Sequence, residues 1–301
     1  MDTRPLSVDP LWPRAGSWPA LDEDGPERAD VTILGIPTWR TSLSPTGAHA
    51  TPAAVRAALR YYSTFAPGLD VERLTFADAG DVTEPDGPQG EARAIAAMAG
   101  AVQLSTLTVA IGGDNALTVP AALGAWGDRL PSAGLITLDA HHDLRDGVSN
   151  GSPVRLLIEA GLDGRRVVQI GIADFANSPA YSARAAAHGI TVVRRDALHR
   201  RPIDDVMAEA LEIAGAGGGP VHVDLDVDVC DRSVAPGCPA SVPGGLAAWE
   251  LRRFARLAGA SHAVRSIDIA EVDATADVDD ARTVRLAALL VLEAAAGVAA
   301  R

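Results

Sequence analysis

Two stretches of the sequence place ionisable side chains at every second position, Asp139-Ala-His-His-Asp143 and Asp224-Leu-Asp-Val-Asp228. Side chains alternate in an extended chain, so each stretch presents three of these groups on one face. The groups are Asp139, His141 and Asp143 in the first stretch and Asp224, Asp226 and Asp228 in the second. If the two faces were adjacent, their carboxylates would repel one another strongly unless a cation lay between them.

Oxygen ligands together with one imidazole suit Mn²⁺ or a similar divalent ion better than a structural zinc. Two such ions could generate hydroxide from a bridging water near neutral pH, which is the chemistry of a hydrolase. A single Asp-x-Asp at a strand end is more often a turn or a helix cap. A third polar segment, Gly112-Gly-Asp-Asn115, also follows an apolar run. The joint occurrence of all three segments favours a metal site.

The composition excludes some classes of function. The formal net charge of −13 argues against nucleic-acid binding, because clustered Lys and Arg are needed to hold a phosphate backbone. The sequence has no signal-peptide pattern and no run of about 18 apolar residues, so we expect no membrane contact. Two cysteines, Cys230 and Cys238, are too few for a disulfide framework and favour a cytoplasmic protein with reduced thiols.

Short runs rich in Val, Ile and Leu alternate with Ala-rich amphipathic stretches, which is typical of repeated β-α units. Most runs are apolar at successive positions, so helices should cover both faces of a mainly parallel sheet. The sequence therefore predicts an α/β fold, a three-layer αβα sandwich with about eight strands. The predicted strands are Val31–Gly35, Leu74–Ala77, Leu107–Gly112, Gly134–Asp139, Arg166–Gly171, Ile190–Arg194, Val221–Asp226 and Val264–Ile269. The predicted helices are Pro52–Tyr62, Glu91–Leu104, Ala116–Trp126, Pro153–Ala160, Ser178–His188, Asp204–Ala214, Ala247–Ala258 and Ala281–Ala299.

Residues 1–29 combine Pro and Trp with mixed charge and no clear period, which predicts an irregular N-terminal arm. No linker interrupts the later repeats, so residues 30–301 are predicted to form a single domain. Ligands of open α/β sheets gather at the carboxyl ends of the strands, where all three polar segments are predicted to lie.

These motifs resemble those of the ureohydrolases, the family of arginases, agmatinases and formimidoylglutamases, over nearly the whole chain. The most specific match is Asp139-Ala-His-His-Asp143, which corresponds to the family's Asp-Ala-His-x-Asp. Ser44–Val55, Asp78–Val82 and Ile267–Asp273 resemble its early segment, its second-strand turn and its last-strand motif. The resemblance implies an arginase-like fold, one or two Mn²⁺ ions as cofactor, and a homo-oligomer, either a trimer or a hexamer.

The resemblance also implies roles for individual residues. The metal ligands would be Asn115, Asp139, His141, Asp143, Asp226 and Asp228, with Asp224 and Asp231 as supporting carboxylates. Asp224 stands where the family motif usually has Ser. Position 115 departs from the usual Gly-Gly-Asp-His, and a neutral amide is a weaker donor to Mn²⁺ than imidazole, so the first metal site should be weak. The resemblance implies that Asn is tolerated at this position in the formimidoylglutamase branch. The loop Leu144–Arg155 also resembles that branch.

The loop Leu144–Arg155 contains two arginines, and Arg pairs with carboxylates in bidentate fashion, so we expect a substrate with one or two carboxylates. The loop resembles the formimidoylglutamase form, which implies N-formimidoyl-L-glutamate, an intermediate of histidine degradation. The expected substrate-binding residues are Arg145, Asn150, Ser152, Arg155 and Glu271. A purely structural role stays open for both arginines, for example contact of Arg155 with Asp146.

The mechanism that the resemblance implies is attack of hydroxide on the formimidoyl carbon, with L-glutamate and formamide as products. Asp143 would orient the hydroxide, and Glu271 would stabilise positive charge on nitrogen. His142 should point away from its metal-binding neighbour. Two alternatives stay open: hydrolysis of agmatine or a guanidino acid with release of urea, and a non-catalytic relative that acts as a partner subunit. Asn115 keeps the second one open, although the other five ligands are retained.

Overall fold

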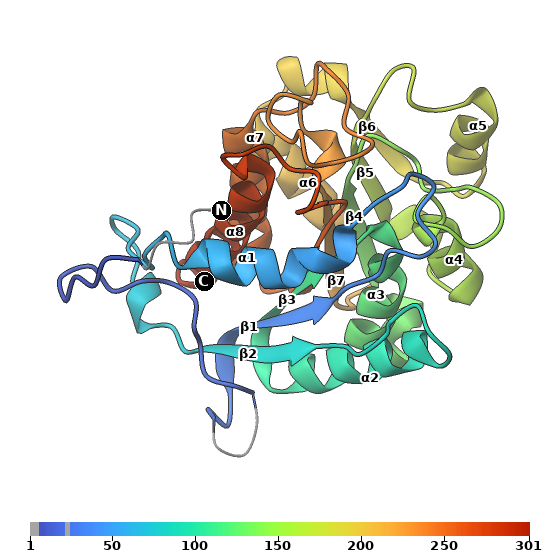
Figure 1. Cartoon of the computed structure of the whole chain (residues 1–301). Coiled ribbons are helices and arrows are strands. Elements are labelled where there is room, and N and C mark those ends of the chain that lie inside the picture. Colours follow the sequence, from blue (N-terminus) through green and yellow to red (C-terminus); the bar gives the residue numbers. More distant parts are fainter. Residues whose placement is uncertain (1–5, 22–24) are drawn as a thin grey trace.

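The computed structural model describes residues 6–21 and 25–301, and its centre is one eight-stranded sheet with the order β2-β1-β3-β8-β7-β4-β5-β6 (Figure 1). All neighbouring strands in this sheet pair in parallel. The strands are β1 (Ala29–Ile36), β2 (Phe76–Asp81), β3 (Ser105–Gly112), β4 (Gly134–Leu138), β5 (Val167–Ile172), β6 (Thr191–Arg194), β7 (Val221–Asp226) and β8 (Val264–Ala270). The predicted parallel sheet is thus confirmed.

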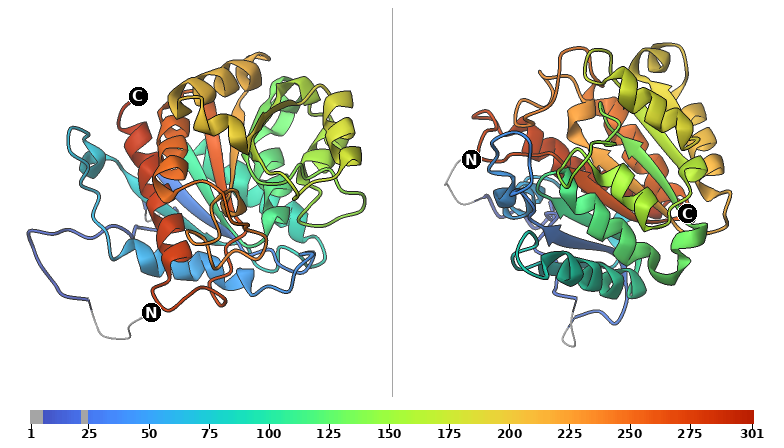
Figure 2. Two further views of the ribbon diagram at one scale, coloured as in Figure 1. Left: turned by 90° about the horizontal axis from the view of Figure 1, so that it is seen from above. Right: turned by 90° about the vertical axis from the view of Figure 1, so that its right-hand side faces the viewer.

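Helices cover both faces of the sheet, as the two views in Figure 2 show. The helices are α1 (Thr51–Leu59), α2 (Gly90–Gln103), α3 (Thr118–Trp126), α4 (Pro153–Ala160), α5 (Pro179–Ala187), α6 (Ile203–Gly215), α7 (Ala248–Ala260) and α8 (Arg282–Val298). Contacts join α1, α6, α7 and α8 into one layer and α2, α3 and α4 into the other, and side chains of α5 pack with α3 and α4. The predicted three-layer αβα sandwich is confirmed.

Strand β7 shows why apolar and acidic residues alternate in a fully buried strand. Val221, Val223 and Leu225 join the main hydrophobic core, which includes residues of α6, α7 and α8. The intervening side chains of β7 point to the opposite face, where the ring of His222 meets Trp126 of α3 edge-on. One face of this strand therefore contributes to the core, and the other carries polar groups toward the strand's carboxyl end.

Strand β2 differs from its prediction. It begins at Phe76 and continues to Asp81, through the segment that the sequence predicted as a turn. Arg56 of α1 binds Asp78 and Asp81 through its guanidinium, with Nε 2.7 Å from Oδ2 of Asp78, and this pairing keeps two acidic residues within an edge strand.

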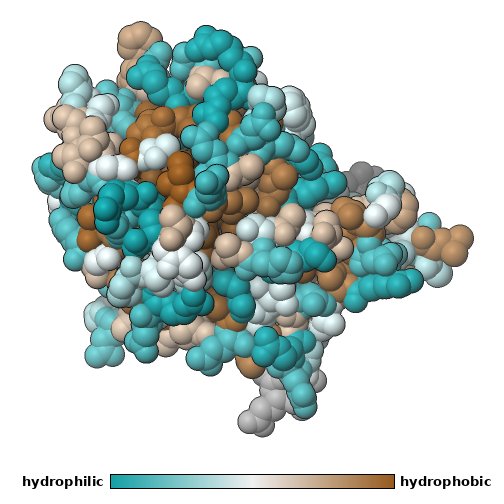
Figure 3. All heavy atoms as spheres, turned by 180° about the vertical axis from the view of Figure 1, so that it is seen from behind, coloured by the Kyte–Doolittle hydropathy of each residue, from teal (hydrophilic) through white to brown (hydrophobic). Residues whose placement is uncertain are grey.

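Within the N-terminal segment, Trp18 stacks on Phe76 with the ring centroids 4.5 Å apart, and Ala20 forms a β-bridge to Asp78. The predicted arm also includes residues 1–5 and 22–24, which lie outside the described residues. Ala29, placed in the arm by the sequence, is already part of β1. The face seen in Figure 3 is largely hydrophilic around a hydrophobic central area. Across the described ranges, none of the helices has the length and apolar character needed to span a bilayer.

Candidate metal centre

The sheet order brings the three polar segments together. Strands β3, β8, β7 and β4 are successive neighbours, and all run in the same direction. Their carboxyl ends therefore lie along one edge, which gathers the segments that follow β3, β4 and β7 with Glu271 at the end of β8. Residues more than 150 positions apart in the sequence come into contact there, since the backbone N–H of Asn115 donates to Glu271 Oε1 at 2.9 Å.

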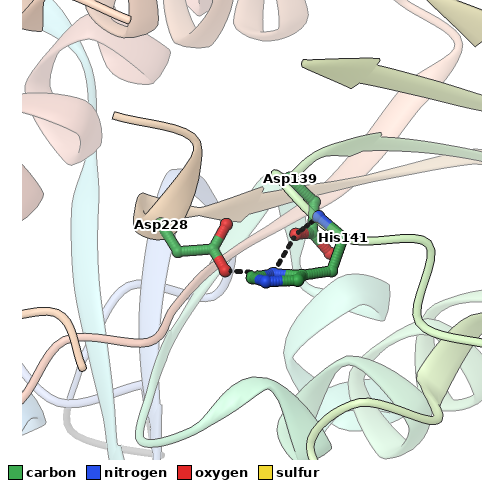
Figure 4. A group of neighbouring side chains, drawn as sticks. All are labelled: Asp139, His141 and Asp228. Carbon is green, nitrogen blue, oxygen red and sulfur yellow. Dashed lines mark hydrogen bonds and ion pairs between the residues drawn. The ribbon is translucent and has the colours of Figure 1, made fainter. Parts of the chain in front are cut away.

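The tightest group of potential ligands is Asp139, His141 and Asp228, whose ligand atoms all lie within 4.8 Å of one another. Figure 4 shows the three side chains converging from the ends of β4 and β7. Nδ1 of His141 lies 2.6 Å from Oδ2 of Asp228 and 3.5 Å from Oδ1 of Asp139. Both aspartates are almost completely buried, whereas the His141 side chain is 30% exposed. An ion bound here would be reached from solvent on the histidine side.

Backbone N–H groups hold the carboxylates of this group in place. The N–H of Ala140 donates to Asp228 Oδ1 at 2.9 Å, which ties the segment after β7 to the segment after β4. The N–H of Asp228 donates to Asp226 Oδ1 at 2.8 Å, so Asp226 caps the short 3-10 turn that carries Asp228. The local fold after β7 is therefore built by the same aspartates that the sequence predicted as ligands.

Asp143 and Asn115 contact each other beside this group. The Asn115 side-chain Nδ2 donates to Asp143 Oδ2 at 2.6 Å, and Asn115 Oδ1 accepts from the Thr118 hydroxyl at 2.7 Å. Asp143 lies 7% exposed, and its φ of +53° is in the left-handed region. Glu271 also has a positive φ, +60°. Such conformations are costly for residues other than glycine and concentrate at functional sites.

The electrostatics of the cluster favour a bound cation. Burial, followed by the charge of Asp228, raises the pKa of Asp139 to about 7. Burial also raises the pKa values of Asp143 and Asp226 well above their ordinary range, and neighbouring carboxylates add to both shifts. Burial by itself would lower the pKa of His141, but the charge of Asp228 and hydrogen bonds to both aspartates raise it to about 12. A positive charge is thus strongly stabilised at this position.

The residues present fit a divalent metal. Oδ2 of Asp139 is buried and has no hydrogen-bond partner among the described residues, which is costly for a carboxylate oxygen unless another ligand takes it up. The donor set combines several carboxylates with one imidazole, which suits Mn²⁺ or a similar ion. The close approach of the chain on the β3 side depends on Gly113, since a Cβ there would lie 1.9 Å from the carbonyl oxygen of Thr38.

A cavity of about 460 Å³ opens beside the cluster. Its lining combines the predicted ligands His141, Asp143, Asp226 and Asp228 with Arg145, Asn150 and Glu271. Asn150 Nδ2 donates to Glu271 Oε1 at 2.7 Å, and burial raises the pKa of Glu271 to about 8 although its hydrogen bonds with Asn150 and with the N–H of Asn115 lower it. The cavity therefore joins the proposed ligands to a buried carboxylate and to a guanidinium.

Two residues expected to bind substrate lie outside the lining of this cavity. Arg155 is directed at its own loop, where Nε donates to the Arg145 carbonyl at 2.5 Å and the guanidinium also binds the Gly147 carbonyl and Glu159. Ser152 is fully buried, and its hydroxyl lies 3.0 Å from that of Ser149. These two residues shape the loop that carries Arg145 and Asn150, and their expected contact with substrate stays a prediction.

The two expected supporting carboxylates have different surroundings. Asp231 accepts from the backbone N–H groups of Ser233 and Gly244 at 2.8 and 2.6 Å, so it organises the loop after β7. Asp224 lies within β7 and is fully buried. Its pKa is raised well above the ordinary range, first by burial and then by the charges of Asp268 and Asp139. His142 turns away from the cluster, with Nδ1 2.7 Å from Gln169 Oε1.

The sequence analysis missed several residues of the cavity wall. Leu43 and Tyr181 line it from outside the recognised motifs, and Ser44 lines it from the start of the early segment without having been expected to do so. Asn177 accepts from the N–H of His142 at 3.0 Å and donates to the Ala140 carbonyl at 2.8 Å, which attaches the loop after β5 to the ligand segment. The only local signal was the Asn-Ser-Pro sequence before α5, which is typical of a helix start and not of a ligand site.

Comparison with known proteins gives a consistent result. The model of the Arginase family matches residues 29–297. A formimidoylglutamase of Halalkalibacterium halodurans is 34% identical over 280 residues, which cover 89% of this chain and 87% of that protein. The crystal structure of formimidoylglutamase from Bacillus subtilis superposes with a TM-score of 0.90 at 28% identity, covering 99% of this chain and 96% of that one. A formiminoglutamase of Trypanosoma cruzi, solved with Mn²⁺, shares the fold with a TM-score of 0.83 at 24% identity and coverage of 91% and 94%.

Proposed function

The chain belongs to the arginase family, and we propose that it hydrolyses N-formimidoyl-L-glutamate to L-glutamate and formamide at a manganese centre. The observation that carries this proposal is the cavity in which His141 and Asp228, which cluster with Asp139, meet Glu271 and Arg145. The similarity to formimidoylglutamases supports the choice of substrate. The sequence-based prediction named the same family and the same reaction.

Asp139, His141, Asp226 and Asp228 would hold the metal, together with Asp143 and, more weakly, Asn115. When bound, Mn²⁺ would supply Lewis acidity that activates water for attack on an amidine carbon. Whether one or two ions bind depends on how tightly Asn115 binds the first of them. We propose further that the protein is cytoplasmic and forms a homo-oligomer, a trimer or a hexamer, with no nucleic acid or membrane as partner.

Glu271 is the group we assign to the amidine nitrogens. Two donors, Asn150 Nδ2 and the N–H of Asn115, bind its Oε1, so Oε2 stays available for substrate. A carboxylate held in a buried site binds the positive charge of the protonated amidine and orients its carbon toward the attacking water. Asp143 would receive the proton of the attacking water and pass it to the glutamate nitrogen as the C–N bond breaks, since its carboxylate lines the cavity and is fixed by Asn115.

Arg145 is the group we assign to a substrate carboxylate. It lines the cavity, and the described residues include no acidic partner within ion-pair distance of its guanidinium. A planar guanidinium binds a carboxylate through two parallel hydrogen bonds. An ammonium tail such as that of agmatine would be repelled by the same group, which favours the dicarboxylate substrate over agmatine.

The deciding experiment compares products. The protein is stripped with a chelator, reloaded with Mn²⁺, checked for metal content, and incubated separately with N-formimidoyl-L-glutamate and with agmatine. Formamide from the first substrate alone is the expected result. Release of urea from agmatine would assign the chain to the guanidine hydrolases instead, and inactivity of the metal-loaded protein on both substrates would exclude the proposed reaction.

A further inference from the structure

A second polar layer lies inside the sheet. It is two residues further from the carboxyl ends of the strands than the proposed ligand Asp226. Its members are Ser266 and Asp268 of β8 and His222 and Asp224 of β7, and each is at most 1% exposed. Pairing places His222 opposite Ser266 and Asp224 opposite Asp268. Asp224 and Asp226 lie on the same face of β7, so this layer adjoins the proposed metal ligands directly.

Hydrogen bonds link these side chains in sequence. Nδ1 of His222 lies 2.7 Å from the Ser266 hydroxyl, and Nε2 lies 2.8 Å from Oδ2 of Asp268. A hydroxyl that donates to Nδ1 fixes the imidazole tautomer with its proton on Nε2, and this proton is then donated to Asp268. Asp268 lies opposite Asp224 in the sheet. The imidazole of His222 therefore orients one of two carboxyls that face each other directly.

The surroundings make this one bond important. The indole of Trp126 covers the imidazole edge-on at a centroid distance of 6.2 Å. Oδ1 of Asp224 and Oδ1 of Asp268 are buried without a partner among the residues that the structure describes. Two carboxyls that face each other in a buried layer repel unless they share a proton or a neighbouring donor binds them. The hydrogen bond between His222 Nε2 and Asp268 Oδ2 therefore fixes one carboxyl of this pair.

We propose that His222, oriented by Ser266, is a positioning residue for the metal centre that acts through Asp268 and Asp224. Its N–H fixes the orientation of the Asp268 carboxyl, and Asp268 faces Asp224, which lies two residues before the proposed ligand Asp226 on the same face of β7. Groups that do not bind the metal themselves but orient its ligands commonly contribute 10- to 100-fold to metal affinity. The inference rests on the proposed manganese centre and is independent of which amidine is hydrolysed.

The test measures Mn²⁺ binding by calorimetry, without substrate, in full-length variants. His222→Leu removes the donor while keeping side-chain volume, and we expect a loss of Mn²⁺ affinity of roughly tenfold or more. His222→Gln offers an amide N–H near the position of Nε2 and should recover part of that loss. Ser266→Ala removes only the group that sets the tautomer, so its loss should be smaller than that of His222→Leu.

The matched control is Thr108→Val. Thr108 lies opposite Ser266 on the neighbouring strand β3, is fully buried, and its hydroxyl has no partner among the described residues. This variant should bind Mn²⁺ as the original chain does. A merely structural role would lower the melting temperature of the metal-free protein and leave the Mn²⁺ dissociation constant unchanged.

The proposal would be overturned if His222→Gln and Ser266→Ala both bound Mn²⁺ with unchanged affinity. If His222→Leu folds, its Mn²⁺ affinity would have to be unchanged as well. If the original chain itself bound no Mn²⁺, the metal centre would be refuted together with it. Inactivity on N-formimidoyl-L-glutamate with normal Mn²⁺ binding would refute only the proposed function, so the two failures are distinguishable.

Discussion

The side-chain amide of Asn115 donates to Asp143 Oδ2 at 2.6 Å, so the nitrogen and not the oxygen of this amide faces the proposed ligands. The oxygen accepts a hydrogen bond from the Thr118 hydroxyl at 2.7 Å. To coordinate a metal through oxygen, the amide must turn over and exchange both partners. We therefore expect only a weak ligand at this position for two reasons, a neutral donor and an unfavourable starting orientation.

Asn115→His should strengthen the first metal site. Imidazole is a better donor to Mn²⁺ than an amide, and it needs no exchange with Thr118 to present a lone pair. We expect the weaker Mn²⁺ dissociation constant to fall roughly tenfold, about 1.4 kcal/mol, as measured by calorimetry. Asn115→Ala serves as the control and should weaken the same site. Equal Mn²⁺ affinity in all three proteins would mean that position 115 does not bind metal.

Glu271→Gln should abolish most activity while leaving Mn²⁺ content intact. The neutral amide keeps the hydrogen bond that the Asn115 N–H donates, but it cannot stabilise positive charge on the amidine. Loss of one group of this kind typically costs 100- to 1,000-fold, about 2.7–4 kcal/mol, in kcat. Steady-state kinetics and metal analysis together check this result. Glu209→Gln, which changes an exposed partner of Arg201, is the matched control and should be neutral.

Arg145→Met should raise KM for N-formimidoyl-L-glutamate roughly 10- to 100-fold, the effect expected when a hydrogen bond to a charged group is lost. Arg155→Met is the comparison within the same loop. Since Arg155 binds the carbonyls of Arg145 and Gly147, its loss should lower the melting temperature and change KM less. A larger KM effect from Arg155 than from Arg145 would reverse the roles that the cavity lining suggests.

Much of this arrangement could be predicted from the sequence because it depends on local periodicity. Among the residues that the structure describes, the apolar runs identified the eight strands and the intervening amphipathic stretches the eight α-helices. The alternation in Asp139–Asp143 predicted a shared face, and the structure brings Asp139 and His141 together with Asp228. A strand that is buried in a parallel sheet can pair in few registers without exposing its apolar residues, so the positions of the strands are strongly constrained by the sequence.

The remaining features depend on tertiary contacts that no local pattern records. The sequence left a structural role open for Arg155, with Asp146 as one partner, but the loop carbonyls and Glu159 take up its guanidinium. Tyr181 reaches the cavity only because α5 follows the loop that Asn177 attaches to the ligand segment. The bond from His222 to Asp268 likewise needed the observed pairing of β7 with β8.

The stability gained from Mn²⁺ should increase with pH. Burial raises the pKa of Asp139 to about 7 and that of Glu271 to about 8, so the folded metal-free chain retains protons that the unfolded chain has already released. The stability associated with these protons is fully present below about pH 4 and is lost as pH rises toward 7–8. The raised pKa of His141 acts in the same direction, because its proton stabilises the fold below the unfolded pKa of about 6.5.

Metal ligands bind in their deprotonated forms, so Mn²⁺ displaces the protons of Asp139 and His141 and relieves the repulsion that destabilises the metal-free protein at higher pH. The increase in melting temperature on adding Mn²⁺ should therefore be larger at about pH 8 than at about pH 6. Thermal denaturation at both values, with and without Mn²⁺, provides the measurement. Asp139→Asn removes one of the shifted carboxyls and should reduce the difference, whereas an equal Mn²⁺ effect at both pH values would show that these carboxyls do not bind the ion.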